Sequence, residues 1–317
     1  MNTNTIKATR NPTHPIIEPR TSDQHWWERN GTFNPGVTEY DGKVILLYRA
    51  YDDFRISRLG YAESSDGINF TKHDNPAIDT NPNDPFERLG IEDPRITKLD
   101  DTYYILHTSA SYHEIGHIPD VRGSFGYIPW RVRVGMRTTK DFISFQNYGV
   151  ILPDIKAKNA FLLPEKVNGE FAVFYREHTE TGETLKVSYS ENFKNWHNTT
   201  EVTWPKADAW EGFKFGAGSQ PIKTEKGWLM VYHAVSNDHV YRLGLMLLDN
   251  KDPSKIIWHA GPILEPETDY EKVGFVNNVV YTCGAIKRGE ELWIYYGAAD
   301  RVIGRAILPL NKIFTKI

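Results

Sequence analysis

Five short apolar segments recur along the chain, and each runs into aromatic and polar residues at its end. Each follows a turn rich in Gly, Asp or Glu, and successive segments begin 57 to 68 residues apart. The segments are VILLYRA from Val44, YYILHTSA from Tyr103, FAVFYREH from Phe171, WLMVYHAV from Trp228 and LWIYYGAA from Leu292. Short apolar runs between turn residues are typical of buried β-strands. The pattern therefore predicts five copies of one β-rich unit.

A second predicted strand follows each of these segments. In RVRVGMR, Val132, Val134 and Met136 alternate with arginines, which is the period-2 pattern of a strand with one buried face. No convincing long helix interrupts the strands, and repeated multi-strand units are typical of β-propellers. We predict an all-β fold, a five-bladed β-propeller in which 31–317 form a single domain after an N-terminal extension, 1–30. A β-sandwich is the alternative, but it does not explain the recurring phrase of strand, tyrosine and polar residue.

The polar residues at the ends of the recurring strands suggest a shared site. We take each recurring strand as the innermost strand of its blade, along a central channel. Residues at the same end of such strands converge on the axis, so five ionisable residues predict a central axial pocket. They are Arg49, His107, Arg176, His233 and Asp300.

The composition argues against several classes of protein. The 317 residues carry a formal net charge of -4, so neither a nucleic-acid partner nor a membrane surface is expected. The first residues, MNTNTIKATRNPTHPIIEP, contain no apolar signal segment, and no run approaches the ~18 apolar residues of a membrane span. The single cysteine, Cys283, is expected to be an inert core thiol, which fits a cytoplasmic protein. The tail LPLNKIFTKI leaves a homo-oligomer open.

One stretch, RLGIEDPRI (88–96), departs from the strand pattern. Glu92 and Asp93 are adjacent carboxylates in a segment whose Leu89, Ile91 and Ile96 suit a buried strand. A solvated turn does not need these apolar residues, and a buried strand does not tolerate two acids without a reason. A general acid that works near pH 7 needs a raised pKa, and burial or a like-charged neighbour supplies one. The pattern alone leaves two explanations open: a functional acid, or structural carboxylates paired with Arg88 or Arg95.

Many ordered phrases resemble glycoside hydrolase family 130, the β-mannoside phosphorylases and related β-mannosidases. They are NPGV (34–37), LYRA (47–50), GIEDPRI (90–96), NAFLLPEKVNG (159–169), FKFGAGSQPIKTEKGWLMVYHAV (213–235), YRLGLMLLDNKDPSKI (241–256), YEKVGFVNNVVYTCGAI (270–286) and IYYGAADRVIG (294–304). The family fold is a five-bladed β-propeller, which agrees with the repeat pattern. The resemblance implies reversible, inverting phosphorolysis of β-linked manno-oligosaccharides, which gives α-mannose 1-phosphate and a shortened sugar.

The resemblance also implies roles for individual residues. Asp93 is the expected catalytic acid, passing its proton through the 3-hydroxyl of the sugar, whereas Glu92 is expected to pair with Arg88 or Arg95. Phosphate is the co-substrate and needs no general base, only donors and positive charge that hold it against the sugar. The implied phosphate-binding residues are Lys158, Asn159, Arg176, Lys214, His233 and Tyr241. The implied sugar-binding residues are Asn34, Arg49, Arg55, for which Arg58 is a competitor, and Asp300.

Two rival functions stay open at this point. A β-mannosidase on the same fold would use a second carboxylate as its base, and a non-catalytic propeller would bind glycans without turnover. No metal or other cofactor is expected. The segment 112–130 departs from the family pattern and is expected to cover the pocket mouth; Gly116 and Pro119 break any helix that would align His113 and His117 for a metal. Neither the linkage, β-1,2 or β-1,4, nor the acceptor (mannose, glucose or N-acetylglucosamine) follows from the sequence.

Overall fold

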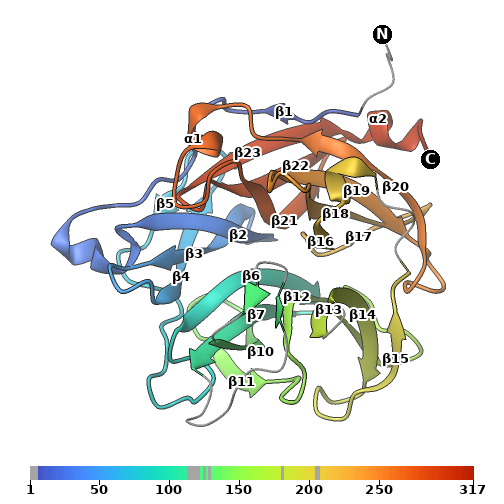
Figure 1. The fold of residues 1–317 in the computed structure, drawn as a ribbon, viewed down its shortest axis with the longest axis horizontal. Coiled ribbons are helices and arrows are strands. Elements are labelled where there is room, and N and C mark those ends of the chain that lie inside the picture. The colour runs from blue at the N-terminus through green and yellow to red at the C-terminus, as the bar shows by residue number, and fades with distance from the viewer. Residues whose placement is uncertain (1–5, 113–121, 124–125, 128–129, 180–181, 204–207) are drawn as a thin grey trace.

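A computed structural model of the chain describes 6–112, 122–123, 126–127, 130–179, 182–203 and 208–317. Its β-strands form five blades around one axis, so the prediction of an all-β five-bladed propeller is confirmed (Figure 1). The helices among these residues are short: η1 (Asp23–Glu28), η2 (Ala209–Glu211), α1 (Asp269–Lys272) and α2 (Leu310–Phe314). None of them has the length and apolar character that a membrane crossing requires.

The blades follow one another along the chain, and one parallel pair, Ser57 with Gly90, joins the first to the second. Blade I contains β2 (Gly31–Tyr40), β3 (Lys43–Tyr51), β4 (Ser57–Ser64) and β5 (Thr71–Lys72). Blade II contains β6 (Gly90–Leu99), β7 (Thr102–Tyr112), β10 (Trp130–Thr139) and β11 (Gln146–Val150), and a separate pair, β8 (Arg122–Gly123) and β9 (Gly126–Tyr127), precedes β10. Blade III contains β12 (Ala157–Leu162), β13 (Phe171–Thr179), β14 (Gly182–Ser190) and β15 (His197–Glu201).

The last two blades carry the second half of the site. Blade IV contains β16 (Lys214–Ala217), β17 (Ile222–Thr224), β18 (Gly227–Val235), β19 (Tyr241–Leu248) and β20 (Ile256–Leu264). Blade V contains β21 (Val280–Arg288), β22 (Glu291–Ala298), β23 (Val302–Pro309) and the N-terminal strand β1 (Thr9–Arg10). Because β1 pairs with β23, the two ends of the described chain close one blade together. The division into 1–30 and 31–317 stays a prediction, but Thr9–Arg10 already belong to a blade.

The first strand of each blade lies nearest the axis. Figure 1 shows β2, β6, β12, β16 and β21 around the centre, with β11, β15, β20 and β1 at the periphery. The recurring apolar segments are the second strands, β3, β7, β13, β18 and β22, so the expectation that they are innermost is wrong. A second strand is covered by strands on both edges and by neighbouring blades on both faces. It therefore carries the longest apolar run, as in β18, where every residue is buried.

Second and third strands share a ring-on-glycine pair. The ring comes from the second strand and the glycine lies directly opposite on the third: Tyr48 with Gly60, His107 with Gly135, Tyr232 with Gly244 and Tyr296 with Gly304. A side chain at any of these glycines would collide with the ring, at 2.3 to 2.4 Å. His107 is thus the blade II counterpart of Tyr48 and not of Arg49. The prediction that His107 belongs to the axial set is therefore wrong, because His107 lies one residue before the position that corresponds to Arg49.

Short helices support the tyrosines of this pair. Glu28 of η1 accepts a hydrogen bond of 2.8 Å from Tyr48, and Glu271 of α1 accepts one of 2.8 Å from Tyr296. Glu211 of η2 accepts the corresponding bond from Tyr232. A buried carboxylate is costly unless it is hydrogen-bonded, so each pairing stabilises the packing of a helix on its blade. This framework fixes the second strands and, through them, the inner strands at the axis.

Candidate active site

The inner strands share one irregularity at the axis. Their pairing register shifts at a single place in four blades: between Phe33 and Gly36, Glu92 and Arg95, Lys158 and Phe161, and Thr282 and Gly284. Three residues at these bulges adopt left-handed backbone, namely Asn34 (φ 48°), Asp93 (φ 52°) and Asn159 (φ 56°). Asn and Asp tolerate this conformation better than other residues with a side chain, and a bulge redirects a side chain out of the strand pattern. The acids in RLGIEDPRI are therefore explained by a bulge that turns Asp93 toward the axis.

Ten of the eleven predicted site residues line one central cavity of about 190 Å³. The exception is Arg55. The ten are Asn34, Arg49, Asp93, Lys158, Asn159, Arg176, Lys214, His233, Tyr241 and Asp300. They come from all five blades, and this convergence is what propeller closure provides. The structure brings these residues together, while their individual roles stay predictions.

Asp93 is held by three neighbours. Its Oδ1 accepts hydrogen bonds from Asn34 Nδ2 at 2.9 Å and from Arg49 Nη1 at 3.3 Å. Its Oδ2 lies 3.5 Å from the Tyr281 hydroxyl. Burial raises the pKa of Asp93, but Arg49, Arg95, Asn34 and Lys158 outweigh burial and leave the pKa below its usual value. The expected rise in pKa is therefore not found, because the cations around the carboxylate stabilise its charged form.

Glu92 and Arg95 have different partners from those expected. Glu92 receives a hydrogen bond of 2.9 Å from Arg49 Nη2 and lies 3.7 Å from Lys158 Nζ, so the predicted pairing with Arg88 or Arg95 is wrong. Arg95 is only 1% exposed and donates to backbone carbonyls, including Asp93 O at 3.0 Å. The other carbonyls are those of Ala217 and Gly218, so Arg95 links the bulge to blade IV.

Three cationic side chains gather on the blade III and blade IV side of the cavity. Lys158 lies on β12, Arg176 on β13 and Lys214 on β16. Burial, then the charges of Arg176 and Lys158, lower the pKa of Lys214 to about 7, although Glu183 acts in the opposite direction. Burial and the charge of Arg176 also hold the pKa of His233 well below its usual value. An anion among these groups would relieve their mutual repulsion.

Arg176 has both a carboxylate partner and a face on the cavity. Its Nε lies 3.3 Å from Glu183 Oε2. A structural role for Arg176 would need a nearby carboxylate, and the sequence offers Glu177 and Glu165 as candidates. They form ion pairs with Lys186 and Lys223 instead, so neither is the partner of Arg176.

Gly216 keeps space open between the cationic and polar groups. A Cβ built at this position would lie 2.6 Å from Asn159 Nδ2 and 2.7 Å from both Arg176 Nη1 and His233 Nε2. Three nitrogens from three different strands therefore point at one spot beside a residue without a side chain. The N–H groups of Asn159 and Arg176 at this spot suit the oxygens of a small anion.

Asp300 lies on the blade V side of the cavity, just after β22, with left-handed backbone (φ 51°). Burial raises its pKa to about 7, and the negative charges of Asp93 and Glu92 add to the effect while Arg49 opposes it. The two carboxyl groups of the cavity therefore have pKa values displaced in opposite directions. Such a divergence is typical of functional carboxyl pairs.

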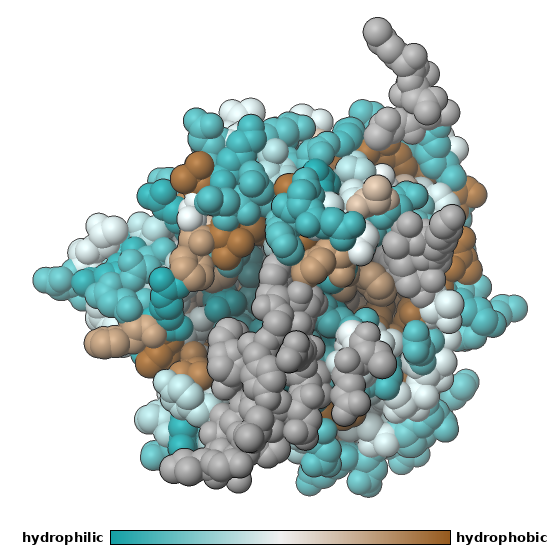
Figure 2. Space-filling model, viewed as in Figure 1, coloured by the Kyte–Doolittle hydropathy of each residue, from teal (hydrophilic) through white to brown (hydrophobic). Residues whose placement is uncertain are grey.

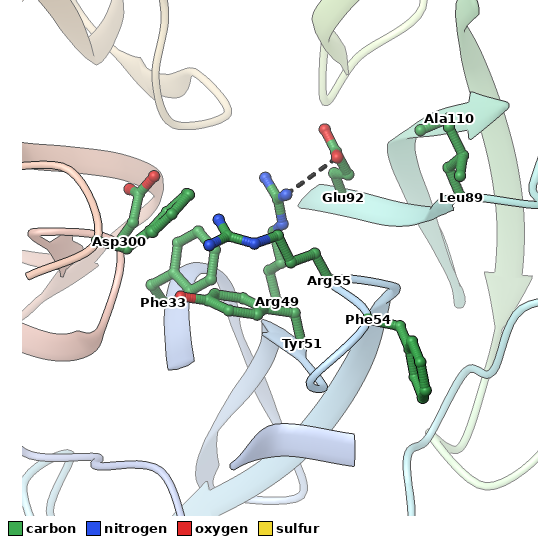
Figure 3. Close-up of a pocket in the computed structure, with 10 residues that line it drawn as sticks. Phe33, Arg49, Tyr51, Phe54, Arg55, Leu89, Glu92, Ala110 and Asp300 are labelled. Atoms are coloured by element: carbon green, nitrogen blue, oxygen red, sulfur yellow. Dashed lines mark hydrogen bonds and ion pairs between the residues drawn. The ribbon is translucent and has the colours of Figure 1, made fainter. Parts of the chain in front are cut away.

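Arg55 belongs to a second cavity, of about 450 Å³, that shares Arg49 and Asp300 with the first. Figure 3 shows Arg49 and Arg55 extending into the space bounded by Asp300 and Glu92. The Arg55 guanidinium lies 3.9 Å from the centroid of the Phe275 ring, and Phe275 is 54% exposed. Its predicted place in the donor set is therefore not supported, because its left-handed turn (φ 61°) directs it to the neighbouring chamber. Its competitor Arg58 is buried in ion pairs with Asp52 and Asp79.

Two other expectations concern the surroundings of the site. His107 does not line the cavity; its Nε2 lies 2.6 Å from Arg137 Nη1. The segment 113–121, with His113 and His117, lies outside the described residues, although β8 contacts β13 and β14.

Among the residues that are described, no three His, Cys, Asp or Glu side chains are grouped so that they could hold a metal. Figure 2 shows a largely hydrophilic face with hydrophobic side chains grouped beside a central depression.

Sequence reasoning missed Tyr281, which lines the cavity and contacts Asp93 and Asn159. It lies two residues before the β21 bulge, in VVYTCGAI. Only an alignment of the inner strands by their bulges, which the sequence does not display, would have singled it out.

The fold and cavity define a class of protein: a β-propeller whose axial cavity combines a buried carboxylate with a group of cations. A sequence profile of glycoside hydrolase family 130, described as beta-1,4-mannooligosaccharide phosphorylase, matches residues 7–317. The chain belongs to this family, and the resemblance seen in the sequence is confirmed.

Curated relatives match over nearly the whole length. The chain is 37% identical over 316 residues to a 1,2-beta-oligomannan phosphorylase of Thermoanaerobacter sp. (strain X514), covering 97% of this chain and 99% of that protein. It is 38% identical over 323 residues to a beta-1,2-mannobiose phosphorylase of the same strain, with the same coverage. A solved structure of β-1,2-mannobiose phosphorylase from Listeria innocua, in complex with β-1,2-mannobiose, superposes with a TM-score of 0.82 at 27% identity, covering 100% of this chain and 99% of that one.

Proposed function

We propose that the protein is an inverting β-mannoside phosphorylase, which converts a β-linked manno-oligosaccharide and phosphate into α-mannose 1-phosphate and a shortened sugar. The observation that carries the proposal is the group formed by Lys158, Arg176 and Lys214 in the cavity that also holds Asp93. Burial, together with the charges of Arg176 and Lys158, lowers the pKa of Lys214 to about 7. A hydrolase has no use for this arrangement, whereas a phosphate co-substrate needs it.

In the proposed reaction, a phosphate oxygen attacks C1 of the mannose from the face opposite to the leaving oxygen. The bond between C1 and that oxygen breaks, the bond from C1 to phosphate forms, and the β configuration becomes α. The leaving oxygen takes a proton that Asp93 supplies, through the 3-hydroxyl of the mannose as the family resemblance implies. Asn34 and Arg49 fix the carboxyl group of Asp93 for this transfer. In synthesis the same carboxylate takes the proton back.

Phosphate binding also resolves the low pKa of Asp93. The cations that lower this pKa include Lys158, which lines the same cavity as the proposed phosphate groups. A bound anion offsets their charge, so the pKa of Asp93 rises when the cavity is filled. Bound phosphate therefore favours the protonated form of Asp93, the form that the transfer requires. This coupling favours proton transfer only when both substrates are present.

We assign the acceptor part of the substrate to the second cavity. It adjoins the donor cavity through Arg49 and Asp300, and its other walls include Phe33, Tyr51 and Phe54. Sugar rings expose apolar C–H faces that pack against aromatic rings, while polar groups at the edge fix their orientation. We propose a β-1,2 linkage, supported by the names of the two curated relatives at 37% and 38% identity.

The test is a product analysis. The protein is incubated with β-1,2-mannobiose or β-1,4-mannobiose, with and without inorganic phosphate. We expect α-mannose 1-phosphate only when phosphate is present, with faster turnover of the β-1,2-linked sugar. Free mannose formed at the same rate without phosphate would establish the β-mannosidase instead, and tight binding without any product would establish a glycan-binding propeller.

Other parts of the proposal concern surroundings and partners. The reaction would use inorganic phosphate as co-substrate without a metal or other cofactor. A cytoplasmic location would suit the single cysteine, Cys283, which is fully buried and whose thiol has a pKa raised by burial. Size-exclusion chromatography with light scattering would decide whether the chain forms a homo-oligomer.

A further inference from the structure

Tyr281 lies where four blades meet at the central cavity. It belongs to β21 of blade V and is 8% exposed. Its hydroxyl oxygen lies 3.1 Å from Arg95 Nη2, 3.1 Å from Asn159 Oδ1 and 3.5 Å from Asp93 Oδ2. Its ring packs on the imidazole of His233, with centroids 4.2 Å apart. One side chain therefore contacts both the proposed acid and two groups of the proposed phosphate site.

The chemistry of these neighbours fixes the direction of the hydrogen bonds. A guanidinium only donates, so the Tyr281 oxygen accepts from Arg95. The single hydroxyl hydrogen of Tyr281 then has two acceptors within reach. Asn159 Oδ1 lies at 3.1 Å and Asp93 Oδ2 at 3.5 Å, so the amide oxygen is the nearer acceptor. Tyr281 thus donates to Asn159.

The direction continues through the amide of Asn159. Because Oδ1 accepts from Tyr281, Nδ2 faces His233 Nε2, at 3.2 Å. An amide nitrogen only donates, so His233 Nε2 must accept and cannot carry a hydrogen. His233 Nδ1 has no hydrogen-bond partner among the described side chains and backbone, so no second contact there sets the tautomer. The contact with Asn159 decides it.

We propose that Tyr281 is a positioning residue that sets a one-way hydrogen-bond chain from Arg95 through Tyr281 and Asn159 to His233. The chain orients the Asn159 amide so that its second N–H, which His233 does not use, remains available for a phosphate oxygen beside Gly216. The inference rests on the proposed function for the meaning of this orientation, but the orientation itself is a property of the free protein.

Tyr281→Phe removes the hydroxyl and keeps the ring on His233. Arg95 retains its bonds to the carbonyls of Gly218 at 2.9 Å and Asp93 at 3.0 Å, so the fold is expected to persist. The KM for phosphate should rise about tenfold, as for the loss of one hydrogen bond, while the KM for the β-mannoside changes less than about twofold. Tyr295→Phe is the matched control, since Tyr295 is buried in the same blade, donates to the Gly67 carbonyl at 3.0 Å, also bonds Arg305, and does not line the cavity. Equal effects on both KM values, or an effect no larger than that of the control, would overturn the positioning role.

A measurement on the unmodified protein tests the chain independently of any variant. Nitrogen-15 NMR of labelled histidine, with the His233 signals assigned from their loss in His233→Asn, reports which ring nitrogen carries the hydrogen. We expect hydrogen on Nδ1 and none on Nε2 in the wild type, and a mixture of tautomers in Tyr281→Phe. Hydrogen on Nε2 in the wild type would reverse the Asn159 amide and refute the chain.

These readouts separate the inference from the proposed function. If the enzyme proved to be a hydrolase, no KM for phosphate would exist, yet the tautomer of His233 would still confirm or refute the hydrogen-bond chain. If phosphorolysis occurred and the wild-type tautomer were the opposite one, the function would stand and the inference would fail.

Discussion

Asn34 Nδ2 donates a hydrogen bond of 2.9 Å to Asp93 Oδ1, and both residues sit at the bulge of an inner strand with left-handed backbone. The bulges of blades I and II thus place the Asn34 amide against the carboxylate of Asp93, the proposed acid. Oδ1 accepts hydrogen bonds from Asn34 and Arg49, whereas the contact of Oδ2 within the described part of the chain is the 3.5 Å one with Tyr281. Oδ2 is therefore the oxygen better placed to exchange a proton with a sugar hydroxyl.

Asp93→Asn should abolish turnover while the fold and sugar binding persist. The amide keeps the shape of the side chain but has no transferable proton, and general acids contribute about 10²–10⁴-fold. Initial rates of phosphorolysis and of synthesis from α-mannose 1-phosphate measure the effect, and calorimetric titration measures binding. Glu92→Gln is the control at the adjacent position, because Glu92 contacts Arg49 and Lys158 but has no proposed chemistry. Near-normal rates in Asp93→Asn would remove it from the role of acid.

Arg176→Ala and Lys214→Ala should each raise the KM for phosphate about ten- to a hundredfold, because a charge-assisted hydrogen bond contributes about 1.5–3 kcal/mol. The KM for the β-mannoside should change much less. The double variant should fall short of additivity if both side chains bind one anion. Lys223→Ala, a mostly exposed lysine of blade IV, should leave both constants unchanged.

A competing outcome follows from the ion pair between Arg176 and Glu183. If Arg176 only compensates that buried carboxylate, Arg176→Ala will lower thermal stability without a phosphate-specific kinetic defect. Thermal unfolding of the variants, measured alongside the kinetics, distinguishes the two roles.

Gly216→Ala tests the anion site without removing any charge. A methyl group here would approach the nitrogens of Asn159, Arg176 and His233 to 2.6–2.7 Å, so at least one of them must move. The backbone of Gly216 is not in the left-handed region, so alanine adds no conformational strain of its own. We expect the KM for phosphate to rise about tenfold or more with little change for the sugar. The control is Ala217→Gly, at the next position of the strand. Gly169→Ala is unsuitable as a control, because Gly169 has a positive φ that alanine would strain. Unchanged phosphate kinetics would place the anion elsewhere.

The fold was largely predictable because its signal is local. Apolar runs and turn residues mark each strand within a few positions, and five repetitions of the pattern define the number of blades. The order of strands from the axis was not predictable, since both first and second strands are apolar and only the closed ring shows which one faces the channel. The prediction that His107 faces the axis failed for the same reason. Its ring faces Gly135 on the neighbouring strand, 28 residues away, and the sequence does not display this pairing.

The site was predictable where residues sit at strand ends or in distinctive phrases, as for Asp93 and Lys214. It was not predictable where a backbone turn decides direction. Arg55 follows the same strand as Arg49, yet it has left-handed backbone and lines the second cavity. Contacts such as Arg95 with Tyr281, 186 residues apart, leave no local pattern in the sequence.

The proposal that the second cavity binds the acceptor predicts an effect of substrate chain length. Phe54 is 85% exposed at its wall, which is unusual for a phenylalanine unless it contacts a ligand or partner. If Phe54 supports a sugar unit beyond the first acceptor position, kcat/KM should increase from β-1,2-mannobiose to the triose and tetraose. Phe54→Ala should remove this increase and leave the biose unaffected, and Phe54→Tyr should retain it. Ile143→Ala, an equally exposed apolar side chain of blade II, serves as the control. Identical chain-length profiles for all four proteins would exclude Phe54 from substrate binding.

The lowered pKa of Lys214 predicts a specific pH dependence. Its ammonium is the charged form below the pKa of about 7, so the free enzyme loses this charge as the pH rises through 7. Since kcat/KM reports the free enzyme, kcat/KM for phosphate should fall above pH 7 through this group. At saturating phosphate the bound anion stabilises the ammonium, so kcat should not show this decrease above pH 7. Lys214→Arg supplies a cation whose pKa lies far above this range. The absolute activity of this variant can differ, but its kcat/KM for phosphate should not decrease above pH 7 through this group.

The ionisation of phosphate and of Asp300 also falls near pH 7, but both are common to the two proteins. They cancel when kcat/KM of the wild type is divided by that of Lys214→Arg at each pH. The ratio should be constant below pH 7 and fall about tenfold per unit above it, as expected for a single group. The same ratio for α-mannose 1-phosphate in the synthetic direction should behave alike, because one site binds both phosphates. A flat ratio between about pH 6 and pH 9 would mean that Lys214 does not titrate there or does not contact the anion, and phosphate recognition would then rest on Arg176 and Lys158.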